Sequence, residues 1–295
     1  MKGLVVLITG GGSGIGAATA KVLQQRGAIP VLVDCDAAPM AQTAAELGGD
    51  VLTIAADVTS LAQCEAAVSQ TLARFGRIDI VWANAGIAAF GPLAYTEPAA
   101  WKRCLEVNVF GVFNTVRAAL PAIQQSRGYV AVSASVATFA HPPAVSAYAA
   151  SKAAVEAMCN AWRIELAGHG VSVGVIHTSW VKTPLMTEGA LHPAFVRLQK
   201  TTPTALRKPM EPDAAAQMIV NGFARRARQI WVPSWIRVLH WLRAWLHTPV
   251  AERELLRAAP QIEQLFVEGL ATHGAKASSQ APRELVRSEA RASQS

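Results

Sequence analysis

The chain has 295 residues, of which 52% are hydrophobic and 16% are charged, and its formal net charge is +7. This composition excludes a chain that is disordered throughout and a charge-based nucleic-acid-binding tail, because it supplies enough apolar side chain for a large core. No apolar run reaches the roughly 18 residues that a membrane-spanning helix needs. We therefore expect a globular protein with no nucleic-acid partner.

Residues 1–200 alternate between β-branched runs and Ala- and Leu-rich stretches of helical length. The predicted strands are 4–9, 29–34, 51–55, 78–83, 129–133 and 171–177. The predicted helices are 15–26, 40–47, 61–75, 99–125 and 147–167. Strands that are apolar on both faces and alternate with helices indicate a parallel sheet covered on both sides. The expected fold class is therefore α/β, a Rossmann-type doubly wound parallel sheet.

The connection over 178–212 is long, contains proline and shows weak periodicity, which is typical of a lid over a functional site. A helix over 213–223 and a last strand over 229–232 follow it. We therefore expect a single catalytic domain over residues 1–232. Beyond it, residues 233–273 predict a helical extension.

The predicted extension is rich in tryptophan, and four of the eight tryptophans fall between 231 and 245. From Trp235 onward, one face of a predicted helix carries the apolar residues Val238, Leu239, Leu242, Trp245 and Leu246. The opposite face is largely basic and carries Arg237, His240, Arg243 and His247. Such a helix over 234–247 can roof a substrate pocket, pack on a neighbouring subunit or lie in a membrane interface, and the sequence leaves these alternatives open. Residues 252–269 predict one more helix, and the small, polar residues 274–295 predict a disordered tail.

The four cysteines, Cys35, Cys64, Cys104 and Cys159, lie far apart and form no C-x-x-C pair. This spacing argues against a disulfide framework and against a zinc site, so we expect no metal. Free thiols fit a reducing compartment. A cytoplasmic protein is therefore expected, with contact to the inner face of a membrane as the alternative that the extension raises.

The first predicted strand ends in a glycine-rich loop that runs directly into a helix. Gly10 permits a tight turn, Gly14 lets the backbone approach a pyrophosphate, and Gly16 lets the helix pack closely on the strand. The first N–H groups of the helix then face the phosphates. This context predicts a dinucleotide-binding site made by Thr9, Gly10, Gly12, Ser13, Gly14, Ile15 and Gly16.

A carboxylate at the end of the second predicted strand bears on the choice of cofactor. Asp34 lies 18 residues after Gly16, close to the spacing of about 20 expected for a carboxylate that holds the adenosine ribose hydroxyls. Asp36 adds a second negative charge that would repel a 2′-phosphate. We therefore expect NAD rather than NADP. The alternative is that Asp34 only caps the helix that follows.

Three later features complete the pattern: Asn84-Ala85-Gly86 after the fourth strand, Ser135 after the fifth, and Tyr148 four residues before Lys152. In this order, and with the glycine loop, the sequence resembles the short-chain dehydrogenase/reductase family over about residues 1–232. The resemblance implies hydride transfer between a nicotinamide cofactor and a secondary alcohol or ketone. It also implies a catalytic tetrad of Asn108, Ser135, Tyr148 and Lys152.

The resemblance assigns further cofactor contacts and shows two departures. Asp57 and Val58 match the pair that holds the adenine ring, and Thr183 matches the threonine that bonds the nicotinamide amide. The members of Asn84-Ala85-Gly86 border the cofactor, as do Tyr148 and Lys152. Ala83 replaces an Asn that usually precedes this motif, and residues 178–183 lack the usual Pro-Gly, which leaves the path of that loop open.

The four implied catalytic residues divide the proton chemistry between them. A free phenol has a pKa of about 10, so Tyr148 needs help to act as an acid/base near neutral pH. Lys152 lies one helical turn further on, and its ammonium, together with the positive charge of an oxidised nicotinamide, favours the phenolate. Ser135 would donate to the substrate oxygen and Asn108 would hold a water that links Lys152 to solvent. Ser133 competes for the serine role, but in a strand end its side chain is expected to bond locally.

The residues expected around the substrate are apolar, namely Phe90, Phe139, Trp180, Leu185 and Met186. They favour an apolar alcohol or ketone as substrate, and the alternative for each aromatic ring is plain core packing. His141 and His177 are expected to be structural. Two other functions stay open: an NADPH-dependent ketoacyl-type reductase, and a catalytically silent dinucleotide-binding regulator. A homo-oligomer, either a dimer or a tetramer, is implied by the family.

Overall fold

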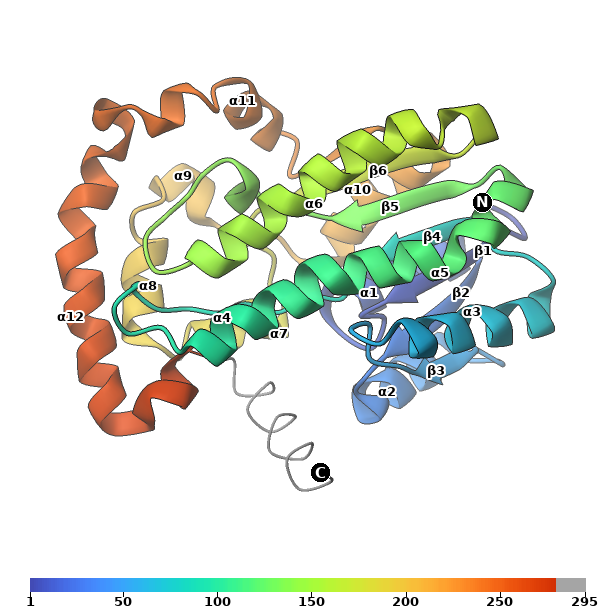
Figure 1. Cartoon of the computed structure of the whole chain (residues 1–295), viewed down its shortest axis with the longest axis horizontal. Helices are drawn as coiled ribbons and strands as arrows, with labels where there is room; N and C mark the ends of the chain where they lie inside the picture. Colours follow the sequence, from blue (N-terminus) through green and yellow to red (C-terminus); the bar gives the residue numbers. More distant parts are fainter. Residues whose placement is uncertain (280–295) are drawn as a thin grey trace.

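The computed structural model describes residues 1–279, and its centre is a seven-stranded parallel sheet (Figure 1). The strands are β1 (Val5–Thr9), β2 (Ile29–Asp34), β3 (Thr53–Ala55), β4 (Ile80–Ala83), β5 (Tyr129–Ser133), β6 (Ser172–Thr178) and β7 (Gln229–Val232). Their order across the sheet is β3-β2-β1-β4-β5-β6-β7, so the winding direction reverses between β1 and β4. Such a switch point opens a crevice at the carboxyl ends of the strands. The predicted doubly wound fold is confirmed.

Helices cover both faces of the sheet, and the strands alternate between the two cores that result. The helices of one face are α3 (Leu61–Phe75), α5 (Gly111–Ser126) and α6 (Ser146–Glu165). Those of the other are α1 (Gly14–Gln25), α2 (Ala37–Leu47) and α10 (Pro212–Ala224). In β1, Val5 and Leu7 belong to the first core, whereas Val6 and Ile8 belong to the second. This period of two is why every residue of β1 is apolar up to Thr9.

The stretch predicted as one helix over 99–125 is interrupted in the structure. It divides into α4 (Pro98–Leu105), a π-helical turn η1 (Glu106–Phe110) and α5. A π-helical turn holds one extra residue and is frequent at functional sites. Asn108 lies inside this turn and is fully buried. Sequence periodicity predicts the two flanking helices but not the extra residue between them.

The connection over 178–212 carries short helices where no regular structure was predicted. They are α7 (Pro184–Gly189), α8 (Pro193–Gln199) and α9 (Thr204–Arg207), and a bridge from Val181 to Met210 ties its two ends together. A proline opens α7 and α8, where its missing N–H costs no hydrogen bond. Two further short turns, η2 (Val136–Thr138) and η3 (Ala167–His169), follow β5 and α6.

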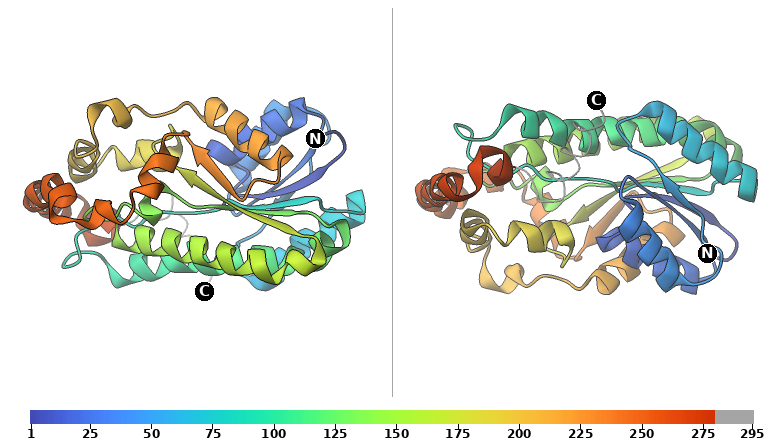
Figure 2. Two further views of the ribbon diagram at one scale, coloured as in Figure 1. Left: turned by 90° about the horizontal axis from the view of Figure 1, so that it is seen from above. Right: turned by 90° about the horizontal axis from the view of Figure 1, so that it is seen from below.

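The extension continues past β7 as α11 (Ile236–Trp241), a 3₁₀ turn η4 (Trp245–His247) and a long α12 (Pro249–Ser279). It arches beyond the carboxyl ends of the strands (Figures 1 and 2). Ala258, Ile262 and Phe266 of α12 pack on Ala194 and Leu198 of α8, which forms a small separate core.

The extension differs from its prediction at two places. The single helix expected from Trp235 is divided between α11 and η4, because the chain turns over the strand ends there. The helix expected over 252–269 is longer, and residues 274–279 belong to α12 rather than to a disordered tail. The rest of the predicted tail, residues 280–295, lies outside the described residues. Within residues 1–279, none of the helices combines the length and apolar character that crossing a membrane requires.

Candidate active site

The loop between β1 and α1 has the backbone geometry that its glycines predict. Gly10 and Gly14 adopt left-handed φ values of 67° and 57°. A Cβ on Gly16 would lie 2.1 Å from the carbonyl oxygen of Gly10, so only glycine allows the helix to start this close to the strand. The Ser13 side chain makes no capping bond at the start of α1. The helix start and its dipole thus form a cradle for an anion, as the phosphates of a dinucleotide require.

Asp34 ends β2 beside this loop. One of its carboxylate oxygens, Oδ2, accepts a hydrogen bond of 3.1 Å from the backbone N–H of Gly12, and Oδ1 accepts one of 3.1 Å from the N–H of Asp36. The N-cap position of α2 is Asp36, so Asp34 is not merely a cap for that helix. The first of these bonds fixes a carboxylate at the rim of the glycine loop.

The groove beside the loop has two connected parts. One part, of about 210 Å³, is lined by Gly10, Ser13, Gly14, Ile15, Asp34, Cys35, Ala56, Asp57, Val58 and Ala85 among others. The other is a cavity of about 610 Å³. Ile15, Asn84, Gly86, Thr183 and Leu185 line both parts, so a ligand can extend from one into the other. This shape and the glycine cradle fit a nicotinamide dinucleotide.

Some of the predicted cofactor residues lie behind the groove and support it. The hydroxyl of Thr9 accepts hydrogen bonds from the backbone N–H groups of Asn84 (3.0 Å) and Ala85 (3.3 Å) and so joins the ends of β1 and β4. Gly12 and Gly16 act through their backbones, as described above. Asp57 lies 3.4 Å from the Arg103 guanidinium, which also reaches this end of the groove.

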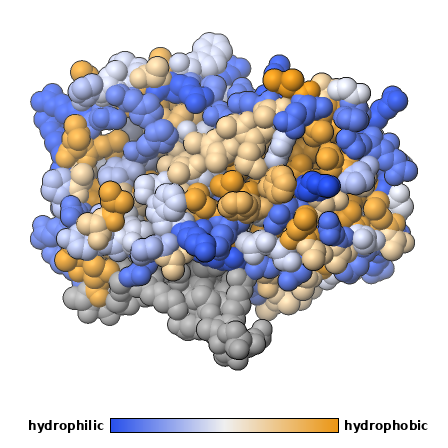
Figure 3. Space-filling model, in the orientation of Figure 1, coloured by the Kyte–Doolittle hydropathy of each residue, from blue (hydrophilic) through white to orange (hydrophobic). Residues whose placement is uncertain are grey.

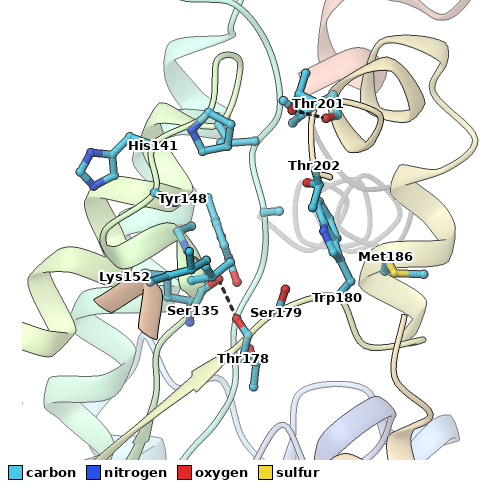
Figure 4. Close-up of a pocket in the computed structure, with 18 of the residues that line it drawn as sticks. Ser135, His141, Tyr148, Lys152, Thr178, Ser179, Trp180, Met186, Thr201 and Thr202 are labelled. Atoms are coloured by element: carbon cyan, nitrogen blue, oxygen red, sulfur yellow. Dashed lines mark hydrogen bonds between the residues drawn. The ribbon is translucent and has the colours of Figure 1, made fainter. Parts of the chain in front are cut away.

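The larger cavity holds the serine, tyrosine and lysine that the sequence singles out (Figure 4). Tyr148 and Lys152 lie one turn apart on α6, and the Lys152 ammonium is 5.5 Å from the centre of the Tyr148 ring. The ammonium donates a 2.9 Å hydrogen bond to the carbonyl oxygen of Ser133. Ser135 begins η2 with a capping box, which fixes its side chain after β5. Three elements therefore converge on one wall of the cavity.

Burial dominates the pKa values of Tyr148 and Lys152. Burial raises the pKa of Tyr148 to about 12, although a hydrogen bond with the Ser135 side chain opposes the rise. Burial also lowers the pKa of Lys152 to about 8. In the protein alone, burial therefore favours the neutral phenol, and the expected help from Lys152 together with an oxidised nicotinamide stays a prediction. A further positive charge is needed beside the ring.

The side chain of Asn108 is held by hydrogen bonds with neighbouring elements. Its side-chain N–H₂ donates to the carbonyl oxygen of Ile87 and to the hydroxyl of Ser151, each at 2.9 Å. Its side-chain oxygen accepts from the N–H of Ile87, also at 2.9 Å. A Cβ on Gly86 would lie 3.2 Å from this oxygen and 3.5 Å from the Lys152 nitrogen. Asn108 thus fixes the loop after β4 close to Lys152.

Ser133, the competitor of Ser135, is engaged in the frame of the sheet. Its hydroxyl accepts a hydrogen bond from the Trp82 indole and donates one to the Asn84 side chain, both at 3.0 Å. The predicted local bonding of Ser133 is confirmed. The hydroxyl of Ser135 is instead placed beside the Tyr148 phenol.

Four of the five predicted substrate residues line the cavity, namely Phe90, Trp180, Leu185 and Met186. Trp180 and Met186 face Tyr148 and Ser135 across it (Figure 4). Phe139 was expected there but is buried beneath, with its ring 5.7 Å from that of His177. The η2 turn before it directs the side chain away from the cavity.

Sequence reasoning left part of the cavity wall undetermined. The extension contributes Trp235, Leu239, Trp245, Leu246 and Leu255, and the lid contributes Thr201 and Thr202. The apolar face of the extension was the sequence signal that could have identified these residues. Roofing of the substrate pocket was one of the three roles that the sequence left open for it. The structure shows that roofing occurs.

The two histidines behave differently. His177 is fully buried and stacks on Trp231 with 4.6 Å between ring centres, and burial lowers its pKa to about 4. His141 lines the cavity and stacks on His247 of the extension at 4.7 Å. His177 therefore belongs to the frame of the site, whereas His141 lies on its surface.

Sequence comparison shows which known proteins this chain resembles. The family model described as short chain dehydrogenase matches residues 4–192, more than half of the chain. The chain is 32% identical over 254 residues to 11-beta-hydroxysteroid dehydrogenase A of Sesamum indicum, which covers 82% of this chain and 71% of that protein. It is 33% identical over 224 residues to 3-oxoacyl-[acyl-carrier-protein] reductase FabG of Thermotoga maritima, which covers 75% of this chain and 90% of that protein.

Solved structures agree with the sequence matches. A short chain dehydrogenase/reductase of Burkholderia phymatum in complex with NAD superposes with a TM-score of 0.74 at 27% identity, over 84% of this chain and 96% of that one. The 3-ketoacyl-(acyl-carrier-protein) reductase of Brucella melitensis complexed with NADH superposes with a TM-score of 0.71 at 30% identity, over 78% of this chain and 97% of that one.

Proposed function

The chain belongs to the short-chain dehydrogenase family, and on that premise we propose that it transfers a hydride between NAD and an apolar secondary alcohol or ketone. It is an oxidoreductase that acts on CH–OH groups with a nicotinamide cofactor. The proposed cofactor and substrate class rest on one observation. Tyr148, Lys152 and Ser135 lie on one wall of an apolar cavity that continues into the glycine-loop groove.

The residues of this wall divide the work around the substrate oxygen. The bound nicotinamide supplies or accepts the hydride and, in its oxidised form, adds the positive charge that the phenolate needs. Tyr148 gives or takes the proton of the alcohol oxygen. Ser135 donates a hydrogen bond to that oxygen where negative charge develops, and Lys152 holds the ribose and favours the phenolate. Asn108 keeps the neighbouring loop in register and holds the water that carries protons from Lys152.

The cofactor contacts follow the groove. The backbone of Gly10, Gly12, Ser13, Gly14, Ile15 and Gly16 surrounds the pyrophosphate in this proposal, with Thr9 behind it. Asp57 and Val58 hold the adenine, Asn84, Ala85 and Gly86 border the nicotinamide ribose, and Thr183 bonds the amide. The lining of both parts of the groove by Thr183, Asn84 and Gly86 supports this assignment.

Replacing the phenol hydroxyl tests the reaction directly. We expect Tyr148→Phe to lower kcat by on the order of a thousandfold, because loss of a positioned acid/base costs roughly 10²–10⁴ in rate. NAD affinity, measured by fluorescence titration, should change less than about threefold, since the phenol adds only one contact. Tyr95→Phe, at an exposed position, is the matched control and should retain full activity. Undiminished turnover in Tyr148→Phe would remove this assignment.

The preference for NAD rests on Asp34. Its carboxylate is fixed at the groove by the Gly12 N–H, where it would repel a 2′-phosphate and accept hydrogen bonds from ribose hydroxyls. We expect Asp34→Ala to raise KM for NAD by about tenfold and to narrow the preference over NADP. The variant Asp50→Ala, at an exposed position, serves as control.

An NADPH-dependent ketoacyl-type reductase is the second candidate, supported by the likeness to the FabG of Thermotoga maritima. Faster turnover with NADPH than with NADH in the unaltered protein would favour it.

A homo-oligomer is part of this proposal. A band of apolar side chains crosses the face formed by α5 and α6 (Figure 3), and Phe110, Phe113 and Ile164 are exposed there. Exposed patches of this kind mark protein interfaces. Light scattering should give the mass of a dimer or tetramer, and Ile164→Glu should lower it. A monomer at all concentrations would exclude this part of the proposal.

A further inference from the structure

The α11–η4 segment of the extension is oriented by a polar face. Glu156 of α6 is buried, and its Oε1 lies 3.4 Å from the His240 Nε2 while its Oε2 lies 3.4 Å from the Arg243 guanidinium. His177 approaches the same carboxylate from β6 at 3.6 Å. A buried carboxylate that engages two side chains of one short segment fixes the rotation of that segment about its axis.

A second face of the segment is apolar and directed inward. Trp235, Leu239 and Leu246 line the cavity that also holds Tyr148. Trp235 and Leu239 are spaced by four residues and therefore lie on the same side of a helix. With the polar face on Glu156 and this face on the cavity, the remaining side of the segment must point outward.

The third face is apolar as well, and it is exposed. Val238, Trp241, Leu242 and Trp245 have exposed fractions of 57%, 79%, 46% and 51%. They run along the segment from α11 through its C-cap residue Leu242 into η4, and we refer to these exposed apolar residues as the stripe. Val250, at the start of α12, is 76% exposed and extends the stripe. Exposed apolar surface gathered on one short segment in this way marks an interaction site.

The charge around the stripe indicates what covers it. The sequence contains no Asp or Glu between Asp213 and Glu252, and of the two arginines within the segment Arg243 is engaged by Glu156, whereas Arg237 lies beside the stripe. The Arg237 guanidinium lies 6.0 Å from the centre of the Trp241 ring. Tryptophan and arginine combine an apolar body with a polar end, which suits the boundary between lipid headgroups and acyl chains. Anionic lipids add attraction for Arg237.

From these three faces we propose that residues 237–250 dock on the surface of an anionic lipid bilayer and that the substrate cavity opens toward it. The position of Trp245 supports the opening of the cavity toward the bilayer. Its side chain lines the cavity and is also half exposed, so it lies at the rim. An apolar alcohol dissolved in the bilayer then reaches the cavity without crossing water. This step rests on the proposed function, whereas docking itself does not.

Vesicle binding tests docking without any turnover. The full-length protein is sedimented with vesicles of equal parts phosphatidylcholine and phosphatidylserine, and with vesicles of phosphatidylcholine alone. We expect stronger binding to the mixed vesicles, and we expect Trp241→Glu to weaken it by roughly tenfold or more, since it removes a large apolar contact and adds a negative charge. Leu93→Glu makes the same charge change at a residue that is 88% exposed and lies outside the extension, and it should bind like the unaltered protein.

The outcomes separate lipid from protein as the occupant. Absence of binding to mixed vesicles, or equal binding by the Trp241→Glu and unaltered proteins, overturns docking. A fall in particle mass in Trp241→Glu without lipid, together with no vesicle binding, identifies a second copy of this chain as the occupant and also overturns it.

Turnover then tests delivery separately. With a short, water-soluble secondary alcohol, Trp241→Glu should react at the unaltered rate, because Trp241 points away from the cavity. With a long-chain secondary alcohol held in mixed vesicles, its kcat/KM should fall by roughly tenfold. Equal loss for both alcohols contradicts delivery from the bilayer, and no turnover of either alcohol by the unaltered protein contradicts the proposed function while leaving the vesicle result intact.

Discussion

The sheet region, residues 1–232, and the extension, residues 233–279, hold their site residues in different ways. In the sheet region, backbone requirements fix the residues: Gly16 has no room for a Cβ, and Asn108 satisfies both polar groups of Ile87. In the extension, a small separate apolar core and contacts with Glu156 fix the wall of the cavity. Chemistry common to a family can thus remain rigid while the wall that selects the substrate rests on replaceable packing.

The largest effect that this comparison predicts belongs to the glycine loop. Gly16→Ala puts a Cβ 2.1 Å from the carbonyl oxygen of Gly10, so the helix start must move away from the phosphate cradle. We expect NAD affinity to fall by on the order of a thousandfold, about 4 kcal/mol. Gly168→Ala, where a Cβ meets nothing within 4 Å, is the control for a glycine exchange. Calorimetric titration measures the NAD affinity of both variants. If Gly16→Ala binds NAD within tenfold of the unaltered protein, the backbone of the glycine loop does not fix the cofactor site in the way described.

The second prediction concerns the junction between the two regions. His177 lies on β6 and faces Glu156, His240 and Arg243, and burial holds its pKa near 4, below its usual 6.5. Between these pH values the unfolded chain takes up a proton that the folded protein does not, so the free energy of unfolding falls as the pH falls. The loss approaches about 3 kcal/mol below pH 4. Urea unfolding across this range measures it.

The variant His177→Gln should remove that part of the pH dependence. His169→Gln, at an exposed position, should keep the slope of the unaltered protein. If the unaltered protein and His177→Gln lose stability in parallel, the buried imidazole does not link the regions in the way described.

The smallest predicted effect lies in the extension. Leu239 lines the cavity, so Leu239→Ala should lower kcat/KM for a bulky apolar alcohol by about tenfold, roughly 1.4 kcal/mol, and leave a small alcohol unaffected. Leu256→Ala, on the same extension but 62% exposed, should change neither substrate. Steady-state kinetics with both alcohols provide the measurement, and an equal loss for both would place Leu239 in the common machinery instead.

Sequence alone predicts the parts of this molecule that local rules govern. The strands, the glycine loop and the Tyr148–Lys152 spacing each depend on residues that are close in the chain, and the structure has them where they were expected. The pKa of Tyr148 in the protein alone depends on burial, which local spacing does not reveal, and the expected joint effect of Lys152 and an oxidised nicotinamide stays a prediction.

The features that sequence missed depend on tertiary contacts. Phe139 was assigned to the cavity, but the direction of its side chain is set by the η2 turn and by His177. The roofing role of the extension could not be separated from its alternatives, because both its inward and outward faces are apolar. The short helices of the lid lack a period long enough to recognise.

The π-helical turn η1 couples the regularity of one helix to the position of a single side chain. Its extra residue turns Asn108 toward Ile87 and Ser151, at the cost of a regular helix from α4 into α5. Deleting one residue from Glu106–Phe110 would restore continuous α-helical geometry and also rotate this amide out of place. A chain shortened by one residue in this turn is therefore expected to gain helical regularity and to lose the contacts that Asn108 makes with the loop after β4.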